Sequence, residues 1–260
     1  MDSPKAVIFD LDETLLIGEA AAVQSFMNIC REAEVACGVK ADVLYQAIRT
    51  HSRSLWRNSS HRPVLLSLGI ASFEGLCSTF EGDYPNFASL RKWAPQFRQD
   101  SWHNALKECG VDDVSLALKL ADAYLGNRRR HQALFPDAIP CLESLSKLYP
   151  LALLTNGTPD LQYEKVATTG IGKYFKTIAV SGEVGFGKPD HRLFEMVLSR
   201  LGNDAVHTWM VGDSLERDIA GAQALGMNTV WVNRDNMQHD RLIGPDIDVS
   251  SLDLLTDIIG

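Results

Sequence analysis

Short apolar runs, each ending in polar or glycine-rich sequence, recur along the chain and are typical of buried strands. Six of them predict strands, the last at an edge of the sheet: residues 6–10, 151–155, 177–181, 208–211, 228–232 and 247–250. The runs are apolar at successive positions, so both faces of the sheet should be covered. Helical patterns separate the later runs, which favours a parallel sheet with helices on both sides.

Proline and glycine mark the ends of the expected helices. Pro189 is expected in the first turn of a helix over residues 189–201, which Gly202 would end. Gly226 would end a helix over residues 215–225 in the same way. Pro159 predicts a further helix that opens just after the second strand.

About 140 positions separate the first two strands, whereas a crossover between parallel strands needs only a dozen or more residues. The excess carries apolar residues at helical spacing over residues 19–36, 42–56, 87–98, 100–109 and 114–124, with breaks expected at Pro63, Pro85 and Pro95. We therefore predict an α/β, doubly wound (Rossmann-like) core formed by residues 1–15 and 135–260. An all-helical cap domain, residues 16–134, would be inserted into it.

Charge and composition limit the kinds of partner and metal site that we expect. The chain has 25 basic and 33 acidic residues, a net charge of −8 that disfavours general binding of nucleic acid or anionic membranes. Five scattered cysteines without a C-x-x-C pair indicate neither a disulfide framework nor a zinc site. We find no secretory signal and no apolar run long enough to span a membrane, so we expect a cytoplasmic protein, as a monomer or homodimer.

Reactive side chains follow the predicted strands, where parallel α/β sheets bind their ligands. These residues are Asp10, Asp12 and Thr14 after the first strand; Thr155, Asn156 and Gly157 at the second; Lys188 in the glycine-rich sequence after the third; and Asp213 and Asp218 after the fourth. Each motif alone has a structural interpretation as a turn, helix entry or cap, and Asp218 would suit the first turn of any helix. Their occurrence at four strand ends favours a functional site.

The residue types point to phosphoryl transfer. Asp10 and Asp12 are so close in sequence that both stay ionised only beside a cation, and Asp213 would complete an all-oxygen site suited to Mg²⁺. Thr155 and Asn156 would donate to an anion, and Lys188 would neutralise either that anion or the nucleophilic carboxylate. In such a site Asp10 attacks phosphorus, and Asp12 protonates the leaving oxygen and then deprotonates the hydrolytic water.

Four motifs, residues 10–14 (DLDET), 155–157 (TNG), 187–189 (GKP) and 212–218 (GDSLERD), resemble those of the haloacid dehalogenase superfamily, in the family's order. The resemblance implies Asp10 as nucleophile and Asp12 as general acid and base. It also implies two sets of binding residues: Thr14, Thr155, Asn156, Gly157 and Lys188 for the phosphate, and Asp10, Asp12, Asp213 and Asp218 for Mg²⁺. The acid at position 12 favours a phosphatase over a dehalogenase.

Residues 153–157, 182–190 and 210–234 look similar to N-acylneuraminate-9-phosphatases and to related pyrimidine nucleotidases and sugar phosphatases. The expected substrate is a small phosphorylated metabolite of the N-acylneuraminate 9-phosphate type. A pyrimidine nucleoside 5′-monophosphate or phosphoglycolate is the alternative. A phosphomutase and a non-catalytic binding protein are rival classes.

Two basic clusters of the insertion are open to two interpretations, a solvated face or a contact with an anion. They are residues 51–62 (His51, Arg53, Arg57, His61 and Arg62) and residues 128–131 (RRRH).

Overall fold

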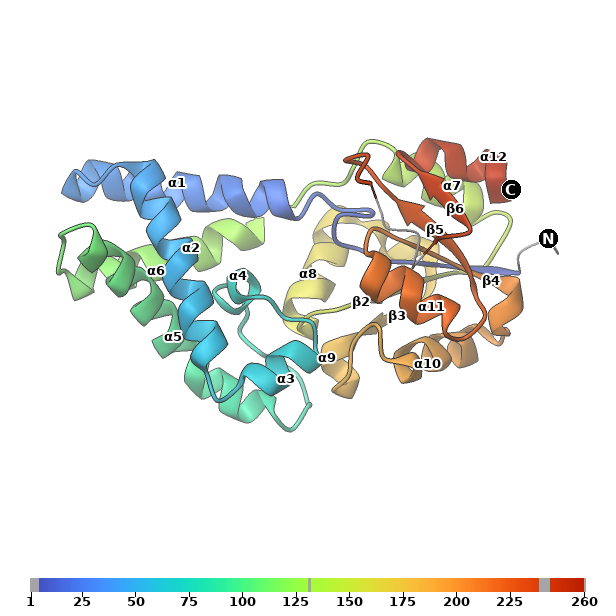
Figure 1. Ribbon diagram of the computed structural model, residues 1–260, viewed down its shortest axis with the longest axis horizontal. Coiled ribbons are helices and arrows are strands. Elements are labelled where there is room, and N and C mark those ends of the chain that lie inside the picture. Colours follow the sequence, from blue (N-terminus) through green and yellow to red (C-terminus); the bar gives the residue numbers. More distant parts are fainter. Residues whose placement is uncertain (1–4, 131, 239–243, 260) are drawn as a thin grey trace. The chain divides into compact units, whose positions relative to one another are not determined.

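The computed structural model describes residues 5–130, 132–238 and 244–259 (Figure 1). The chain divides into two compact units, which we describe separately. The α/β unit consists of Met1–Gly18, Ala133–Asn156 and Val166–Gly260, and the helical unit consists of Glu19–Gln132 and Gly157–Lys165. The assignment of residues 16–134 to a cap and of the remainder to a catalytic core stays a prediction.

A six-stranded sheet forms the centre of the α/β unit (Figure 1). Its strands are β1 (Ala6–Phe9), β2 (Leu151–Thr155), β3 (Phe175–Val180), β4 (Thr208–Gly212), β5 (Asn228–Val232) and β6 (Ile247–Val249). All neighbouring strands are parallel, in the order β3-β2-β1-β4-β5-β6. The predicted α/β class and the edge position of the sixth strand are confirmed. The third strand begins earlier than expected, at Phe175.

Alternating residues of β1 serve the two faces of the sheet, as strand geometry requires. Val7 and Phe9 join one hydrophobic cluster, and Ala6 and Ile8 join another. The first cluster includes residues of α7 (Ala138–Leu145) and α12 (Leu255–Ile259), and the second includes residues of α10 (His191–Leu201) and α11 (Ala220–Gln223). The remaining helical segments of this unit are α9 (Ser181–Val184), the end of α8 (Pro159–Thr169), and the short turns Ile171–Tyr174, Ala205–His207 and Leu252–Leu254. Helices therefore cover both faces, as predicted.

Two helix starts differ from the sequence prediction. Pro189 lies outside α10, because the Asp190 side chain accepts a hydrogen bond from the amide of Arg192 and so caps a helix that begins at His191. The expected helix over residues 215–225 divides into a π-helical turn, Leu215–Ile219, and α11. The amides of Asp218 and Ile219 both donate to the Ser214 carbonyl, which widens this first turn.

The helical unit contains α1 (Glu19–Cys37), α2 (Ala41–Asn58), α3 (Arg62–Ser67), α4 (Ser72–Gly75), α5 (Phe87–Glu108), α6 (Val114–Arg130) and the start of α8. The expected break at Pro95 is wrong, because α5 continues through it. An interior proline costs roughly 3 kcal/mol, but buried residues on both sides, including Ala94, Phe97 and Trp102, anchor this helix in the core of the unit. Tertiary packing thus outweighs the local preference.

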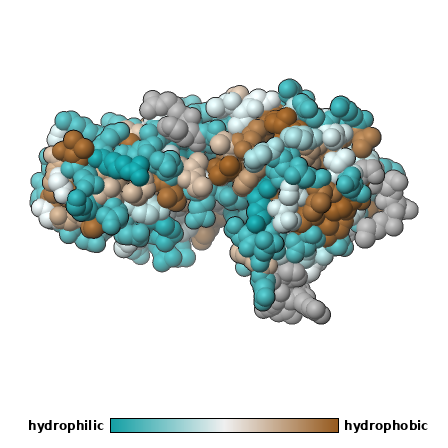
Figure 2. Space-filling view, turned by 90° about the horizontal axis from the view of Figure 1, so that it is seen from above, coloured by the Kyte–Doolittle hydropathy of each residue, from teal (hydrophilic) through white to brown (hydrophobic). Residues whose placement is uncertain are grey.

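Within the described ranges, the helices are all too short or too polar to cross a membrane. Figure 2 shows one face of the molecule, on which hydrophilic residues predominate and hydrophobic residues gather in separate patches. Such a mixed surface is ordinary for a globular protein.

Candidate active site

Three carboxylates meet at the carboxyl ends of two adjacent strands. Asp10 directly follows β1, and Asp213 directly follows β4, its parallel neighbour. The amide of Asp10 donates to the Val211 carbonyl at 2.9 Å, so the ladder continues up to the first carboxylate. Asp218 belongs to the π-helical turn that follows. One oxygen from each of these three carboxylates lies within 4.8 Å of the other two.

Lys188 lies among these carboxylates. Its Nζ atom is 2.5 Å from Oδ1 of Asp10 and 2.7 Å from Oδ1 of Asp218. Its side chain is 3% exposed, so the ammonium group has little access to water. A buried ammonium requires such partners, because an unpaired charge away from water is strongly unfavourable. The structure therefore brings together four residues that the sequence predicted from three separate motifs.

The carboxylates outnumber the ammonium, and their pKa values reflect this. Burial, followed by the charges of Asp10 and Asp218, raises the pKa of Asp213 to about 8. Burial also raises the pKa of Asp10 to about 6, although Lys188 acts in the opposite direction. Burial alone would lower the pKa of Lys188, but Asp10 and Asp218 outweigh it and raise that pKa. The site thus favours an additional positive charge.

Asn156 fixes the backbone of Lys188. Its Nδ2 atom donates to the Lys188 carbonyl at 3.0 Å, and the Lys188 amide donates to Asn156 Oδ1 at 2.8 Å. Because Asn156 directly follows β2, the neighbour of β1, the sheet positions the lysine through this amide. The sequence suggested Asn156 as a donor to phosphate. The geometry gives its side chain a positioning role, and the phosphate contact stays a prediction.

Replacing Gly187 by alanine is expected to destabilise this arrangement. A Cβ atom there would lie 2.6 Å from Asn156 Oδ1 and 3.1 Å from the Ser181 Cβ, so the buried amide would have to move. We expect a loss of about 1–3 kcal/mol in the free energy of unfolding, measured by urea denaturation. Gly244→Ala is the control, because its added Cβ would meet nothing within 4 Å. Equal midpoints for the two variants would contradict the prediction.

A backbone amide binds the Asp218 carboxylate, and an indole N–H binds the backbone of Asp213. The Ser214 amide donates to Asp218 Oδ2 at 3.0 Å, and the Trp231 Nε1 donates to the Asp213 carbonyl at 2.7 Å. Gly212 is needed beside them, because a Cβ atom would lie 2.5 Å from the Asp218 Cγ. Sequence reasoning treated Trp231 only as part of a buried strand. Apolar patterning carries no signal for its indole hydrogen bond.

Thr14 and Asp12, the other predicted residues of the loop after β1, differ in how they interact with Asp10. Thr14 Oγ1 donates to Asp10 Oδ2 at 3.3 Å. Asp12 is not one of the three clustered carboxylates, although its charge contributes to the raised pKa of Asp10. Its Oδ1 atom lies beside Gly18, 3.3 Å from where a Cβ of that residue would be. A role for Asp12 as metal ligand stays a prediction.

The remaining predicted residues continue from β2. Thr155 is buried, and its hydroxyl donates to the Asn156 carbonyl at 3.4 Å. Gly157 has a φ of 139°, and a Cβ there would collide with the Gln162 side chain, so glycine suits this turn. The boundary between the two units falls between Asn156 and Gly157.

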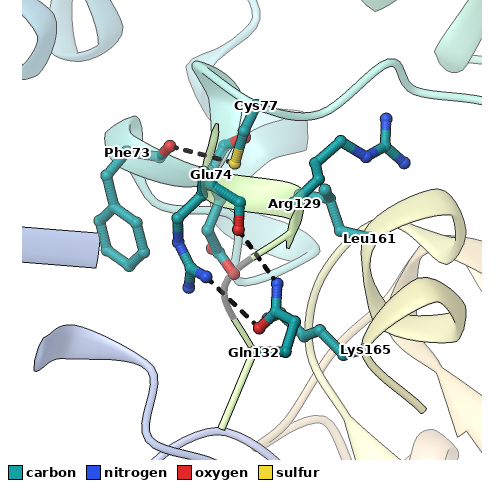
Figure 3. A pocket seen from close by; sticks show the side chains of 8 residues that line it. Phe73, Glu74, Cys77, Arg129, Gln132, Leu161 and Lys165 are labelled. Carbon is teal, nitrogen blue, oxygen red and sulfur yellow. Dashed lines mark hydrogen bonds between the residues drawn. The ribbon is translucent and has the colours of Figure 1, made fainter. Parts of the chain in front are cut away.

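The helical unit has a small pocket (Figure 3). Its lining residues are Phe73, Glu74, Cys77, Arg128, Arg129, Gln132, Leu161 and Lys165. Basic side chains from α6 and α8 share it with one acid and several apolar groups. It contains none of the site residues predicted from the sequence.

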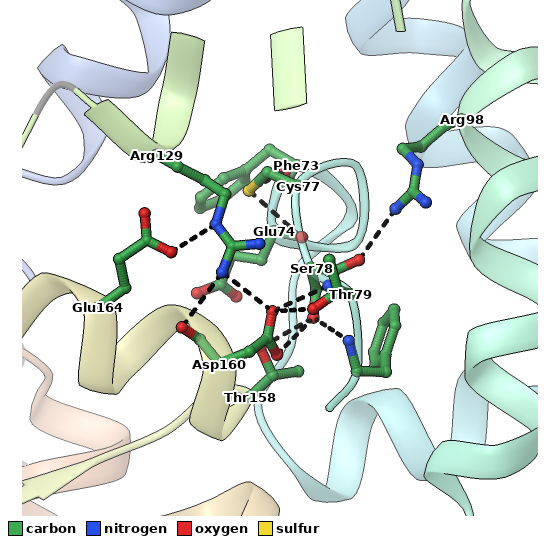
Figure 4. Close-up of polar contacts among 11 residues, drawn as sticks. Phe73, Glu74, Cys77, Ser78, Thr79, Arg98, Arg129, Thr158, Asp160 and Glu164 are labelled. Carbon is green, nitrogen blue, oxygen red and sulfur yellow. Dashed lines mark hydrogen bonds and ion pairs between the residues drawn. The ribbon is translucent and has the colours of Figure 1, made fainter. Parts of the chain in front are cut away.

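Hydrogen bonds fasten the start of α8 to the rest of the helical unit (Figure 4). Asp160 accepts from the amide and hydroxyl of Thr79, each at 2.9 Å, and from the Ser78 hydroxyl at 3.3 Å. Arg129 lies 3.5 Å from Asp160 and 2.5 Å from Glu164. Of the second basic cluster, Arg129 therefore pairs with acids of the chain itself.

The first basic cluster behaves largely as a solvated face. Arg53, Arg57 and Arg62 are exposed, and His51 contacts Glu108 at 2.7 Å on the surface. In the second cluster, His131 lies outside the described residues, as does the side chain of Arg130.

The chain is similar to known proteins in sequence and in fold. A family model for haloacid dehalogenase-like hydrolases matches residues 4–226. Phosphoserine phosphatase of Thermus thermophilus is 34% identical over 249 residues, which cover 95% of this chain and 96% of that protein. N-acylneuraminate-9-phosphatase of Rattus norvegicus is 35% identical over 140 residues, 53% of this chain and 56% of that protein. The magnesium-bound structure of the putative HAD-hydrolase YfnB from Bacillus subtilis covers 100% of both chains, with a TM-score of 0.69 and 24% identity.

Proposed function

The chain belongs to the haloacid dehalogenase-like hydrolases, and we propose that it is a magnesium-dependent phosphatase that forms a covalent intermediate on Asp10. The observation that carries this proposal is the cluster of Asp10, Asp213 and Asp218 around the buried Lys188. We further propose that it acts in the cytoplasm on small phosphorylated metabolites.

The residues fit Mg²⁺. Three ionised carboxylates against one ammonium leave two negative charges uncompensated, which matches a divalent cation. An all-oxygen donor set with room for water is the kind that Mg²⁺ prefers. Bound by Asp10, Asp213 and Asp218, Mg²⁺ would supply positive charge beside the phosphoryl oxygens.

Asp10, Asp12 and Lys188 have separate roles in the proposed hydrolysis. A carboxylate oxygen of Asp10 attacks phosphorus, and the bond from phosphorus to the leaving oxygen breaks. Asp12 gives that oxygen its proton, so an alcohol leaves and an aspartyl-phosphate remains. Asp12 then removes a proton from water, which attacks phosphorus, releases phosphate and restores the Asp10 carboxylate. Lys188 keeps Asp10 in position and offsets negative charge throughout.

Two substrates have the strongest support. O-phosphoserine comes first, because the Thermus phosphatase matches nearly the whole chain, the helical unit included. N-acylneuraminate 9-phosphate, the type expected from the sequence, follows, since that relative matches about half the chain. Pyrimidine nucleoside monophosphates and phosphoglycolate complete the set.

Phosphate release from this panel, with Mg²⁺ and with a chelator, tests the proposal. We expect one or two compounds to be hydrolysed rapidly and only with the metal. Transfer of phosphate between positions of a sugar without free phosphate would instead indicate a mutase. If the folded, metal-loaded protein released phosphate from none of them, hydrolysis of these compounds would be ruled out.

Magnesium is expected to stabilise the protein more at high pH than at low pH. The pKa of Asp213 in the folded chain is about 8, against roughly 4 for an unfolded chain. Without metal, the folded state binds more protons in this window, so its stability falls as pH rises from about 4 to about 8. A cation bound to the ionised carboxylates should offset this loss of stability.

Thermal unfolding with and without Mg²⁺, at about pH 6 and about pH 8, measures the effect. The rise in Tm should be larger at the higher pH and should shrink in Asp213→Asn. A rise of the same size in that variant would show that the ion binds elsewhere.

A further inference from the structure

A partly buried ion pair joins two parts of the α/β unit that are distant in sequence, next to the site. Arg234 Nη1 donates to Asp137 Oδ2 at 2.8 Å, and Nη2 donates to Oδ1 at 3.0 Å. This is the two-pronged geometry in which an arginine binds a carboxylate most strongly. The guanidinium also lies 3.7 Å from the ring centroid of Phe135, which fixes its plane. The side chains of Arg234 and Asp137 are 18% and 7% exposed.

The same guanidinium reaches the loop that carries the nucleophile. Arg234 Nη2 also donates to the Thr14 carbonyl at 2.9 Å. The hydroxyl of Thr14 in turn donates to Asp10 Oδ2, whereas Lys188 contacts the other oxygen of that carboxylate, Oδ1. Arg234 thus lies two hydrogen bonds from Asp10.

Two further donors hold the Asp137 carboxylate in place. It accepts from the Ser251 hydroxyl and from the Leu252 amide, each at 2.9 Å. These donors come from the segment after β6. With the two hydrogen bonds from Arg234, the Asp137 carboxylate therefore accepts four.

We propose that Arg234 is a positioning residue for the phosphatase reaction: anchored by Asp137, it holds the Thr14 carbonyl and thereby sets the place of Asp10. This inference rests on the proposed function. Its physical basis is that a displacement of about 1 Å in a reacting group can cost on the order of 100-fold in rate. In the described part of the chain, the side chain of Arg234 contacts Asp137, Phe135 and Thr14. Its influence on Asp10 therefore runs through the loop of residues 10–14.

Arg234→Lys is the first test variant. Lysine keeps the charge beside Asp137 but lacks the planar fork that bonds two groups at once. We expect kcat to fall about 10- to 100-fold with little change in KM. We also expect amide hydrogen exchange over residues 11–16 to become about 10-fold faster, a readout that does not need activity.

Arg200→Lys is the matched control, because it makes the same change at an exposed arginine of α10 that donates to the Ile178 carbonyl and has no contact with the loop in the described part of the chain. It should keep the wild-type kcat and the wild-type exchange at residues 11–16. The double variant Asp137→Leu/Arg234→Leu replaces the pair by apolar groups and should fold. Its kcat should fall as much as that of Arg234→Lys.

The outcomes separate this inference from the proposed function. Wild type and Arg200→Lys must both release phosphate for the reaction itself to stand. If they do and Arg234→Lys shows unchanged kcat and exchange, the positioning role is wrong. An equal loss in Arg200→Lys would also overturn it, since the effect would then follow general stability. If none releases phosphate but exchange changes only in the Arg234 variants, the proposed function fails and the hold on the loop survives.

Discussion

Asp10→Asn is expected to abolish phosphate release, with a loss of at least about 10³-fold in kcat. An amide oxygen is a far weaker nucleophile than a carboxylate, and no other group described at the site takes its place next to both Lys188 and Thr14. The assay is phosphate release from the best substrate of the panel, with Mg²⁺ in excess.

The fold of this variant should persist. Lys188 keeps its contact with Asp218 at 2.7 Å. Burial and the charge of Asp218 both disfavour the ionised form of Asp10, so removing this negative charge should lower the repulsion among the carboxylates. Circular dichroism and thermal unfolding should therefore match wild type or exceed it. Asp42→Asn, at an exposed position of α2, is the control and should retain full activity. Residual activity of Asp10→Asn near the wild-type level would exclude the covalent mechanism.

Lys188→Met is expected to damage both activity and stability. Removal of the ammonium leaves buried carboxylates without their shared partner, and breaking a buried pair costs roughly 3–5 kcal/mol. Lys188 lowers the pKa of Asp10, so without it that pKa should rise above its present value of about 6. The loss of stability should therefore be larger at about pH 8 than at about pH 5, where carboxyl groups with raised pKa values are protonated.

Urea denaturation at the two pH values, without metal, tests this pH dependence. Added Mg²⁺ should restore part of the stability of Lys188→Met without restoring hydrolysis, because the metal offsets charge but leaves Asp10 misplaced. Lys147→Met, at an exposed position, should behave as wild type under all conditions. A denaturation midpoint of Lys188→Met that did not depend on pH would show that the carboxylates are not coupled to the lysine.

Much of the α/β unit follows from local sequence, because a buried parallel strand needs little more than an apolar run with a polar end. Leu151–Thr155 and Asn228–Val232 are found where the sequence predicts them. The meeting of Asp10 with Asp213 follows in the same way, since parallel neighbours end at the same edge of the sheet. Helix ends were less predictable where side chains compete with the backbone, as Asp190 does before α10.

The rest depends on contacts between residues far apart in the sequence. Pro95 looks like a helix end until the buried residues on either side of it are known. Asn156 looks like a phosphate donor, yet its amide is used on the backbone of Lys188. Trp231 and Arg234 carry no local sign of hydrogen bonds to Asp213 and Thr14. Such roles appear only when the fold brings the partners together.

The sheet order has a consequence for how the protein is made. β1 is synthesised first, yet its two hydrogen-bonded neighbours, β2 and β4, begin only at Leu151 and Thr208. On a ribosome that adds about 5–20 residues per second, this fully apolar strand waits many seconds for a partner. Meanwhile most of the helical unit, Glu19–Gln132, is already complete. The nascent chain therefore presents most of the helical unit after a strand that is still unpaired, and an unpaired apolar strand is prone to aggregation.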